Sequence, residues 1–287
     1  MAVIAMTREM GTRGKDVAAE LADRLGLEVV HHELVERHVA ERMSVAESTV
    51  HRFLEGDASL WERWNVDQRR LYHFTAVEIL ELAQKGNVII RGWGAAQLLS
   101  EVPHVICARI CAPMSYRLAE MRRRLKIDDD DAEIARETDR GDATALRREI
   151  DRSDSAHDQA VRAHFNRDWR DPAGYNIVLN TAMTPVGVCA DILAGMVGLD
   201  VFQQTEESRA TLNDKLTLAR VRGVIDENAQ QTLGGGLELS ISKGVVTVSG
   251  ITLTGAVDAS MINAIKSVEG VVAVEDDIRL MPSTYTV

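Results

Sequence analysis

The sequence of 287 residues predicts an α/β fold, in which a parallel sheet covered by helices is followed by a small α+β module. Apolar runs too short for a helix alternate with stretches of helical periodicity, a pattern typical of parallel strands buried on both faces. A glycine-rich turn joins the first apolar run to the first helix. After about Leu199 the pattern changes to strands with one polar face, which indicates a second unit.

The composition restricts the classes of function. Hydrophobic residues make up 45% of the chain, which favours a packed core, and the net charge of -11 disfavours binding to nucleic acid. The cysteines Cys107, Cys111 and Cys189 are too few for a disulfide framework and lack the spacing of metal ligands, so we expect no metal site built by the protein alone. The N-terminus lacks the features of a signal peptide, and no apolar run is long enough to span a membrane. We therefore expect a cytoplasmic protein.

The first unit is predicted to cover residues 1–200. We expect strands at residues 3–7, 88–90, 105–111 and 177–179. Residues 33–85 and 114–165 have mainly helical character, and a further helix is expected to end near Leu193. The helix after the first strand carries apolar residues four positions apart and ends at Gly26.

The turn after the first strand has the features of a phosphate-binding loop. Glycines would let the backbone curl around an anion with its N–H groups pointing inward, while a lysine and the beginning of the next helix add positive charge. The candidate residues are Gly11, Thr12, Arg13, Gly14, Lys15 and Asp16. The Walker A pattern is not met, because Glu9 replaces its first glycine and Asp16 replaces the hydroxyl residue that binds magnesium. Thr12 or Asp16 would then take that role, and a plain glycine turn is the alternative interpretation.

Three ordered segments resemble the cytidylate kinase-like family. Residues 7–15 are similar to its loop S-R-E-x-G-S-G-G-R, residues 88–95 to its V-I-V-G-R-G-A turn, and residues 169–181 to its W-x-D-P-x-x-Y-D-L-x-L-N-T ending. The resemblance covers residues 1 to about 195. It implies a P-loop nucleoside monophosphate kinase that uses ATP and Mg²⁺ and whose acceptor is most simply CMP or dCMP.

The resemblance also implies roles for charged residues, because phosphoryl transfer depends on positioning and charge neutralisation. It assigns catalytic roles to Lys15, Arg117, Arg123 and Asp154, and it places Arg8 and Arg91 at the substrate. The arginines at 122–124 resemble a lid over the ATP phosphates. Aspartates follow at 128–131, so a solvated helix face is the alternative.

Some positions depart from the family pattern and put turnover in question. Trp93 stands where the family has an arginine, and Ile150 and His157 stand where arginines flank the two aspartates of another motif. Compensation would have to come from neighbouring arginines, namely Arg148, Arg152 or Arg162. Two interpretations follow: an active kinase, or a nucleotide sensor that has lost turnover. The aromatic residues of the helical insert favour core packing over stacking on a base; they are Trp61, Trp64, Tyr72 and Phe74.

After a polar linker at 201–211, residues 212–287 resemble a BON domain with the order α-β-β-α-β. The segments that carry the resemblance are 243–250 and 268–274, with Leu216, Val221 and Ile225 on the first helix. The resemblance implies a regulatory or interaction domain for an unknown ligand or protein partner. An envelope protein that interacts with phospholipid is the third interpretation of the whole chain.

Overall fold

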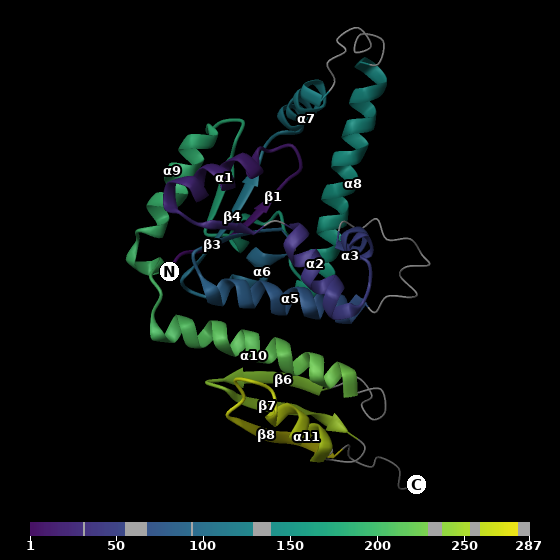
Figure 1. Cartoon of the computed structure of the whole chain (residues 1–287), viewed down its shortest axis with the longest axis vertical. Coiled ribbons are helices and arrows are strands. Elements are labelled where there is room, and N and C mark those ends of the chain that lie inside the picture. The colour runs from purple at the N-terminus through teal and green to yellow at the C-terminus, as the bar shows by residue number, and fades with distance from the viewer. Residues whose placement is uncertain are drawn as a thin grey trace, which may run out of the picture.

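The computed structural model describes residues 1–30, 32–54, 68–92, 94–128, 139–228, 237–252 and 259–280. A five-stranded sheet with helices on both faces forms the first part, and a three-stranded sheet forms the second. Helix α10 (Glu206–Asn228) lies between the two parts, as Figure 1 shows.

The larger sheet contains β1 (Val3–Arg8), β2 (Glu28–Val30), β3 (Val88–Arg91), β4 (Val105–Cys111) and β5 (Ile177–Asn180). Its strand order is β2-β3-β1-β4-β5, and every neighbouring pair is parallel. The predicted parallel sheet and four of its strands are confirmed. Strand β2 was not predicted, because a three-residue edge strand with an exposed Glu28 is too short to show a period.

Alternate residues of the strands enter two separate cores. On one face, α1 (Gly14–Leu25) and α9 (Val186–Val197) cover the side chains of Ile4 and Met6. On the other face, four of the described helices of the first part cover Val3 and Ala5. These are α2 (His32–Met43), α3 (Glu47–Leu54), α5 (Gln68–Lys85) and α6 (Ala95–Leu99). Burial on both faces explains why the strands are apolar throughout.

Two further helices, α7 (Met114–Asp128) and α8 (Asp139–Phe165), follow β4. Figure 1 shows α8 running alongside the first part, from the region of α7 down to α2 and α3. Short 3₁₀ turns at Pro172–Gly174 and Asp200–Phe202 precede β5 and α10 respectively. Helix α8 therefore brings residues after position 150 back toward the carboxyl ends of β1 and β3.

The second part has the predicted order α-β-β-α-β. After α10 come β6 (Leu237–Ser242), β7 (Val245–Thr252), α11 (Ala259–Lys266) and β8 (Ala273–Leu280). Strand β7 is antiparallel to β6 and parallel to β8. Lys243 and Gly244 close the predicted hairpin turn with φ values of 51° and 77°, the left-handed conformation that such turns require.

Helix α10 belongs to both parts. It begins at Glu206, within the segment expected to be a linker. Leu212 and Leu216 are buried in the core shared with α5, whereas Val221 is buried in the core of the smaller sheet. One continuous helix thus joins the two units through packed side chains at both of its faces.

No single helix among the described residues has the length and apolar character needed to cross a membrane. The helices at Val186–Val197 and Asp200–Ile225 meet that criterion only as a pair, and the chain bends by 78° between them.

Candidate functional site

In the loop after β1, two backbone carbonyl groups accept hydrogen bonds from side chains of other segments. The carbonyl of Met10 accepts a hydrogen bond from Nε of Arg117 at 2.6 Å, and that of Thr12 accepts one from the hydroxyl of Thr181 at 2.6 Å. The hydroxyl of Thr12 itself donates to the carbonyl of Glu9 at 2.7 Å. These bonds come from α7, from the turn after β5 and from the loop itself, so the loop conformation depends on segments far apart in sequence.

The amide groups of the same loop have the opposite arrangement. Within the described chain, the backbone N–H groups from Met10 through Lys15 donate to no acceptor. Gly11 and Arg13 have φ values of 77° and 59°, which curl the backbone, and α1 begins at Gly14. Successive unsatisfied amides at a helix N-terminus form a concave anion-binding surface. The predicted phosphate-binding residues are therefore together in one loop of suitable shape.

Glu9 explains how the loop forms without the first Walker glycine. Its carboxylate accepts hydrogen bonds from Arg109 at 2.6 Å and from the backbone N–H of Ala112 at 3.2 Å. Arg109 lies on β4 and Ala112 directly after it, so the buried Glu9 fixes the loop to the neighbouring strand. The residue that breaks the Walker pattern is thus an anchor of the loop.

Arg117 and Asp154 form a buried, bidentate ion pair. Nη1 and Nη2 of Arg117 donate to the two carboxylate oxygens at 2.9 and 2.7 Å, and the residues are only 4% and 6% exposed. Arg170 approaches Asp154 at 3.4 Å. Such fork-to-fork pairing has strong geometric specificity. Here it joins α7 to α8 directly behind the loop.

The other predicted charges lie around the beginning of α1. Lys15 is exposed and forms no ion pair within the described part of the chain, whereas Arg13 binds Asp16 at 2.7 Å. Arg123 binds the buried Glu120 at 2.8 Å, and this hydrogen bond is the largest of the effects that lower the pKa of that carboxyl. Lys15 is therefore available to an incoming anion, while Arg13 and Arg123 already have carboxylate partners.

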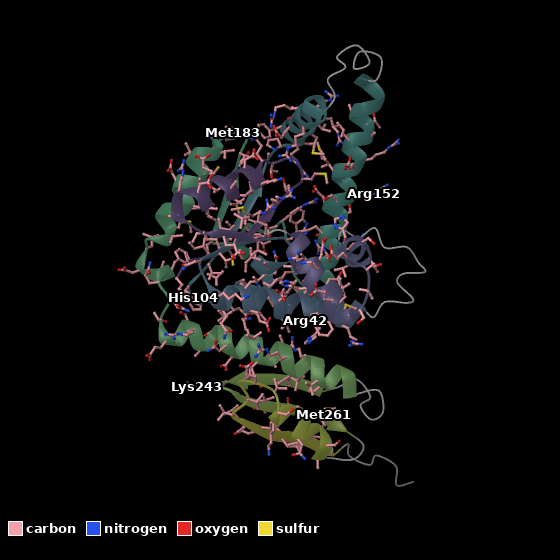
Figure 2. All side chains as sticks on the ribbon, viewed as in Figure 1. Arg42, His104, Arg152, Met183, Lys243 and Met261 are labelled. Atoms are coloured by element: carbon pink, nitrogen blue, oxygen red, sulfur yellow. The ribbon has the colours of Figure 1, made fainter. Side chains whose placement is uncertain are left out.

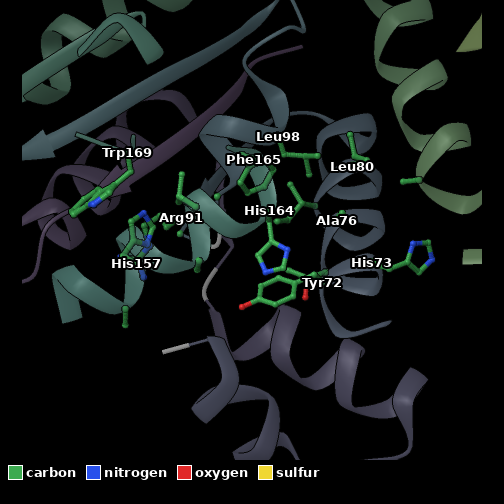
Figure 3. Close-up of a pocket in the computed structure, with 18 of the residues that line it drawn as sticks. Tyr72, His73, Ala76, Leu80, Arg91, Leu98, His157, His164, Phe165 and Trp169 are labelled. Atoms are coloured by element: carbon green, nitrogen blue, oxygen red, sulfur yellow. The ribbon is translucent and has the colours of Figure 1, made fainter. Parts of the chain in front are cut away.

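A cavity of about 600 Å³ opens beside the loop. Arg8, Met10, Arg91, Asp154 and His157 line its end nearest the loop. Figure 3 shows Arg91 and His157 at this end, with aromatic and aliphatic side chains extending away from them. A cavity of this size is typical of a site for a small ligand. Arg8 and Arg91, the two predicted substrate residues, thus line the same cavity.

Trp169, Arg109 and Arg170 form a cluster that sequence spacing does not predict. The guanidinium groups of Arg109 and Arg170 lie 5.2 and 5.4 Å from the ring centre of the buried Trp169. His157 packs edge-on against the same ring at 4.5 Å, and burial lowers its pKa to about 4. The sequence contains one signal for this cluster, because Arg109 is a lone charged residue within the otherwise apolar strand β4.

Three arginines could replace those missing from the family pattern, namely Arg148, Arg152 and Arg162, and none of them lines this cavity. Arg148 and Arg152 are exposed on α8, and Figure 2 labels Arg152. Arg162 pairs with Asp158 and Asp168 instead. Ile150, at one departure from the family pattern, is fully buried.

Tyr72 lines the cavity, and both Tyr72 and Phe74 pack against the core. Trp61, Trp64 and Trp93 lie outside the described residues. Among the described residues, no group of three or more His, Cys, Asp and Glu side chains is arranged to hold a metal ion.

Comparisons with known proteins concern the family and the fold of the first part of the chain. The model of the cytidylate kinase-like family matches residues 3–183. An uncharacterized protein from Eubacterium ventriosum is similar in structure over 69% of this chain and 98% of its own, with 16% identity and a TM-score of 0.50. This likeness shows a shared fold.

Two further structures match with lower scores. Shikimate kinase from Bacteroides thetaiotaomicron has 14% identity and a TM-score of 0.38, over 69% of this chain and 99% of its own. The YorR protein from Bacillus subtilis, solved with phosphorylated GDP, has 13% identity and a TM-score of 0.39, over 71% and 100%. A comparison with curated proteins gives no match.

Proposed function

Because the chain belongs to the cytidylate kinase-like family, we propose that it transfers the γ-phosphoryl group of ATP to a nucleoside monophosphate of the CMP or dCMP type. The observation that carries this proposal is the loop at residues 10–15, whose amides have no acceptor within the described chain. Directly beside it lies a cavity, and Arg8 and Arg91 are among the residues that line it. The arrangement offers one anion site for the donor and a second for the acceptor.

In the proposed reaction, a phosphate oxygen of the acceptor attacks the γ-phosphorus of ATP. The bond from that phosphorus to the β–γ bridging oxygen breaks, and the products are ADP and a nucleoside diphosphate. The loop amides and Lys15 would bind the donor phosphates, while Arg8 and Arg91 would bind the acceptor phosphate and reduce its repulsion from the donor. No general base is needed, because a phosphate monoester oxygen is already largely deprotonated near pH 7.

Magnesium would supply charge neutralisation between the donor phosphates. Asp16 fits the role of its protein ligand, since it lies in the first turn of α1 and Mg²⁺ sites commonly use one or two carboxylates together with substrate phosphates. Its present partner is Arg13 at 2.7 Å. Thr12 does not fit, because its hydroxyl is buried and donates to the carbonyl of Glu9.

Arg117 and Asp154 take a positioning role in this proposal. Both are committed to each other behind the loop, and Arg117 also holds the carbonyl of Met10. Arg123, at the exposed surface beside Glu120, remains the candidate for contact with the donor phosphates. It would have to leave Glu120 for that purpose, and Arg124, which also binds Glu120 at 3.2 Å, would still pair with that buried carboxylate.

A second function is favoured by these same ion pairs. Because Arg117 and Arg123 already have carboxylate partners, the chain would have fewer free cations for a transition state than its family resemblance implies. A sensor that binds nucleotide without turnover has the same loop. In either case we propose that the second part, a BON-like module, has a regulatory or interaction role in the cytoplasm.

The experiment that separates these functions is an assay of ADP formation. Purified full-length protein is incubated with ATP, Mg²⁺ and, in turn, CMP, dCMP, UMP, AMP and GMP. Acceptor-dependent ADP supports the kinase. ATP binding by calorimetry without ADP formation supports the sensor, and the absence of ATP binding contradicts both.

A further inference from the structure

The acceptor cavity has a wall that comes from beyond the residues matched by the family model. Lys215, Leu218, Ala219 and Arg222 of α10 line it at the end away from the phosphate-binding loop. The family model ends at residue 183, and α10 begins at Glu206. The site as described is therefore closed by the helix that begins the second part of the chain.

Helix α10 is held in this position by specific contacts with the first part. Lys215 binds Glu101 at 2.6 Å, Arg220 binds Glu81 at 3.0 Å, and Leu212 is fully buried in the shared core. A Cβ atom at Gly223 would collide with the ring of His73, which shows how closely α10 approaches α5 there. The wall is consequently a packed element whose position is fixed by burial and by ion pairs.

The middle of the cavity differs in chemistry from its phosphate end. Leu80, Leu98 and Phe165 line it from α5, α6 and α8, and Figure 3 shows them on the side away from Arg91 and His157. Leu218 is half-buried and faces the same space without belonging to the packed core. An anion-binding end followed by an apolar region suits a ligand with a phosphate at one end and a flat, weakly polar ring at the other.

We propose that α10 forms part of the acceptor site and that Leu218 determines which base is accepted. The inference rests on the proposed function, because it identifies the ligand as a nucleoside monophosphate. The phosphate binds at Arg8 and Arg91, and the base packs between Phe165 and Leu218. Selectivity for the size of the base is then set by a residue of the second part of the chain.

The test measures binding of CMP, UMP, AMP and GMP to full-length protein by calorimetry, in the presence of a non-hydrolysable ATP analogue. Leu218→Trp reduces the space for the base, so we expect it to weaken AMP and GMP binding about tenfold more than CMP and UMP binding. Leu218→Ala enlarges the space and shifts the ratio in the opposite direction. Arg209→Trp places the same ring on an exposed position of α10 outside the cavity and serves as the matched control.

The outcomes separate the two proposals. Opposite shifts in base selectivity for the two Leu218 variants, with unchanged affinity for the ATP analogue, support the inference. Wild-type binding of nucleoside monophosphates with equal selectivity in all variants overturns the inference and leaves the proposed function intact. A parallel loss for every base shows a structural role and also overturns it. If wild-type protein binds no nucleoside monophosphate, both proposals fail.

Discussion

Arg117 holds both carboxylate oxygens of Asp154 in its guanidinium fork and, through Nε, the carbonyl of Met10. One side chain thus joins α7, α8 and the loop after β1. Because Asp154 also lines the cavity, the same ion pair connects the shape of the loop with the wall of the acceptor site.

Removing one partner of this pair is expected to be costly. Arg117→Ala leaves a buried carboxylate without its main cation, and the loss of one member of a buried pair typically lowers the free energy of unfolding by about 3–5 kcal/mol. Urea unfolding of wild type and of Arg117→Ala measures this difference in free energy. As a control, Arg123→Ala removes an exposed arginine from the same helix and should unfold almost like wild type. Equal losses of stability in the two variants would show that burial of the Arg117–Asp154 pair does not matter.

The close approach of the loop to α7 gives a second prediction. A Cβ atom at Gly11 would lie 2.7 Å from the carbonyl oxygen of Arg117, whereas one at Gly26 would meet nothing within 4 Å. Both glycines have positive φ, 77° and 64°, so both substitutions by alanine carry the same backbone strain of about 1 kcal/mol. We expect Gly11→Ala to lower both stability and ATP affinity well beyond Gly26→Ala in thermal unfolding and calorimetry. Indistinguishable variants would mean that the loop does not pack against α7 in solution.

His157 should make the stability of the protein sensitive to acid. Burial lowers its pKa from 6.5 to about 4, so between these pH values the unfolded chain binds a proton that the folded chain does not. Stability is therefore lost as the pH falls, by about 2 kcal/mol between pH 6.5 and 5. Urea unfolding at both pH values should show this loss in wild type and not in His157→Gln, apart from what other groups contribute equally to both proteins. The same pH dependence in the two proteins would place His157 in solvent.

Much of the fold was predictable from periodicity, because each buried strand is an uninterrupted apolar run between helical stretches. The runs at β1, β3 and β4 carry this signal, and the alternating residues at 237–242 carry it for the smaller sheet. Strand β2 lacked the signal because only Val30 is fully buried there. The role of α10 was not predictable either, since a helix with one face in each of two cores has apolar residues on several sides.

The site was predictable where the function depends on local backbone shape and not where it depends on distant partners. The glycines and Lys15 are adjacent in sequence, so their geometry follows from a short motif. The partners of Glu9 and Arg117 lie about a hundred and about forty residues away along the chain, and sequence spacing does not show which carboxylate a given arginine will meet. For the same reason the family resemblance implies catalytic roles for Arg117 and Asp154 but does not reveal their mutual ion pair.

The most direct test of the whole account is ATP binding by full-length protein, measured by calorimetry with Lys15→Ala and Lys85→Ala. Lys15 is exposed at the anion-binding loop, which follows the carboxyl end of β1. Lys85 is exposed at the end of α5 and precedes the amino end of β3, at the other edge of the parallel sheet. We predict that Lys15→Ala weakens ATP binding at least about tenfold, as expected for the loss of one charged contact, and that Lys85→Ala binds like wild type. Equal affinity in all three proteins, or no binding to wild type, would contradict the assignment of the loop at residues 10–15 as the donor phosphate site.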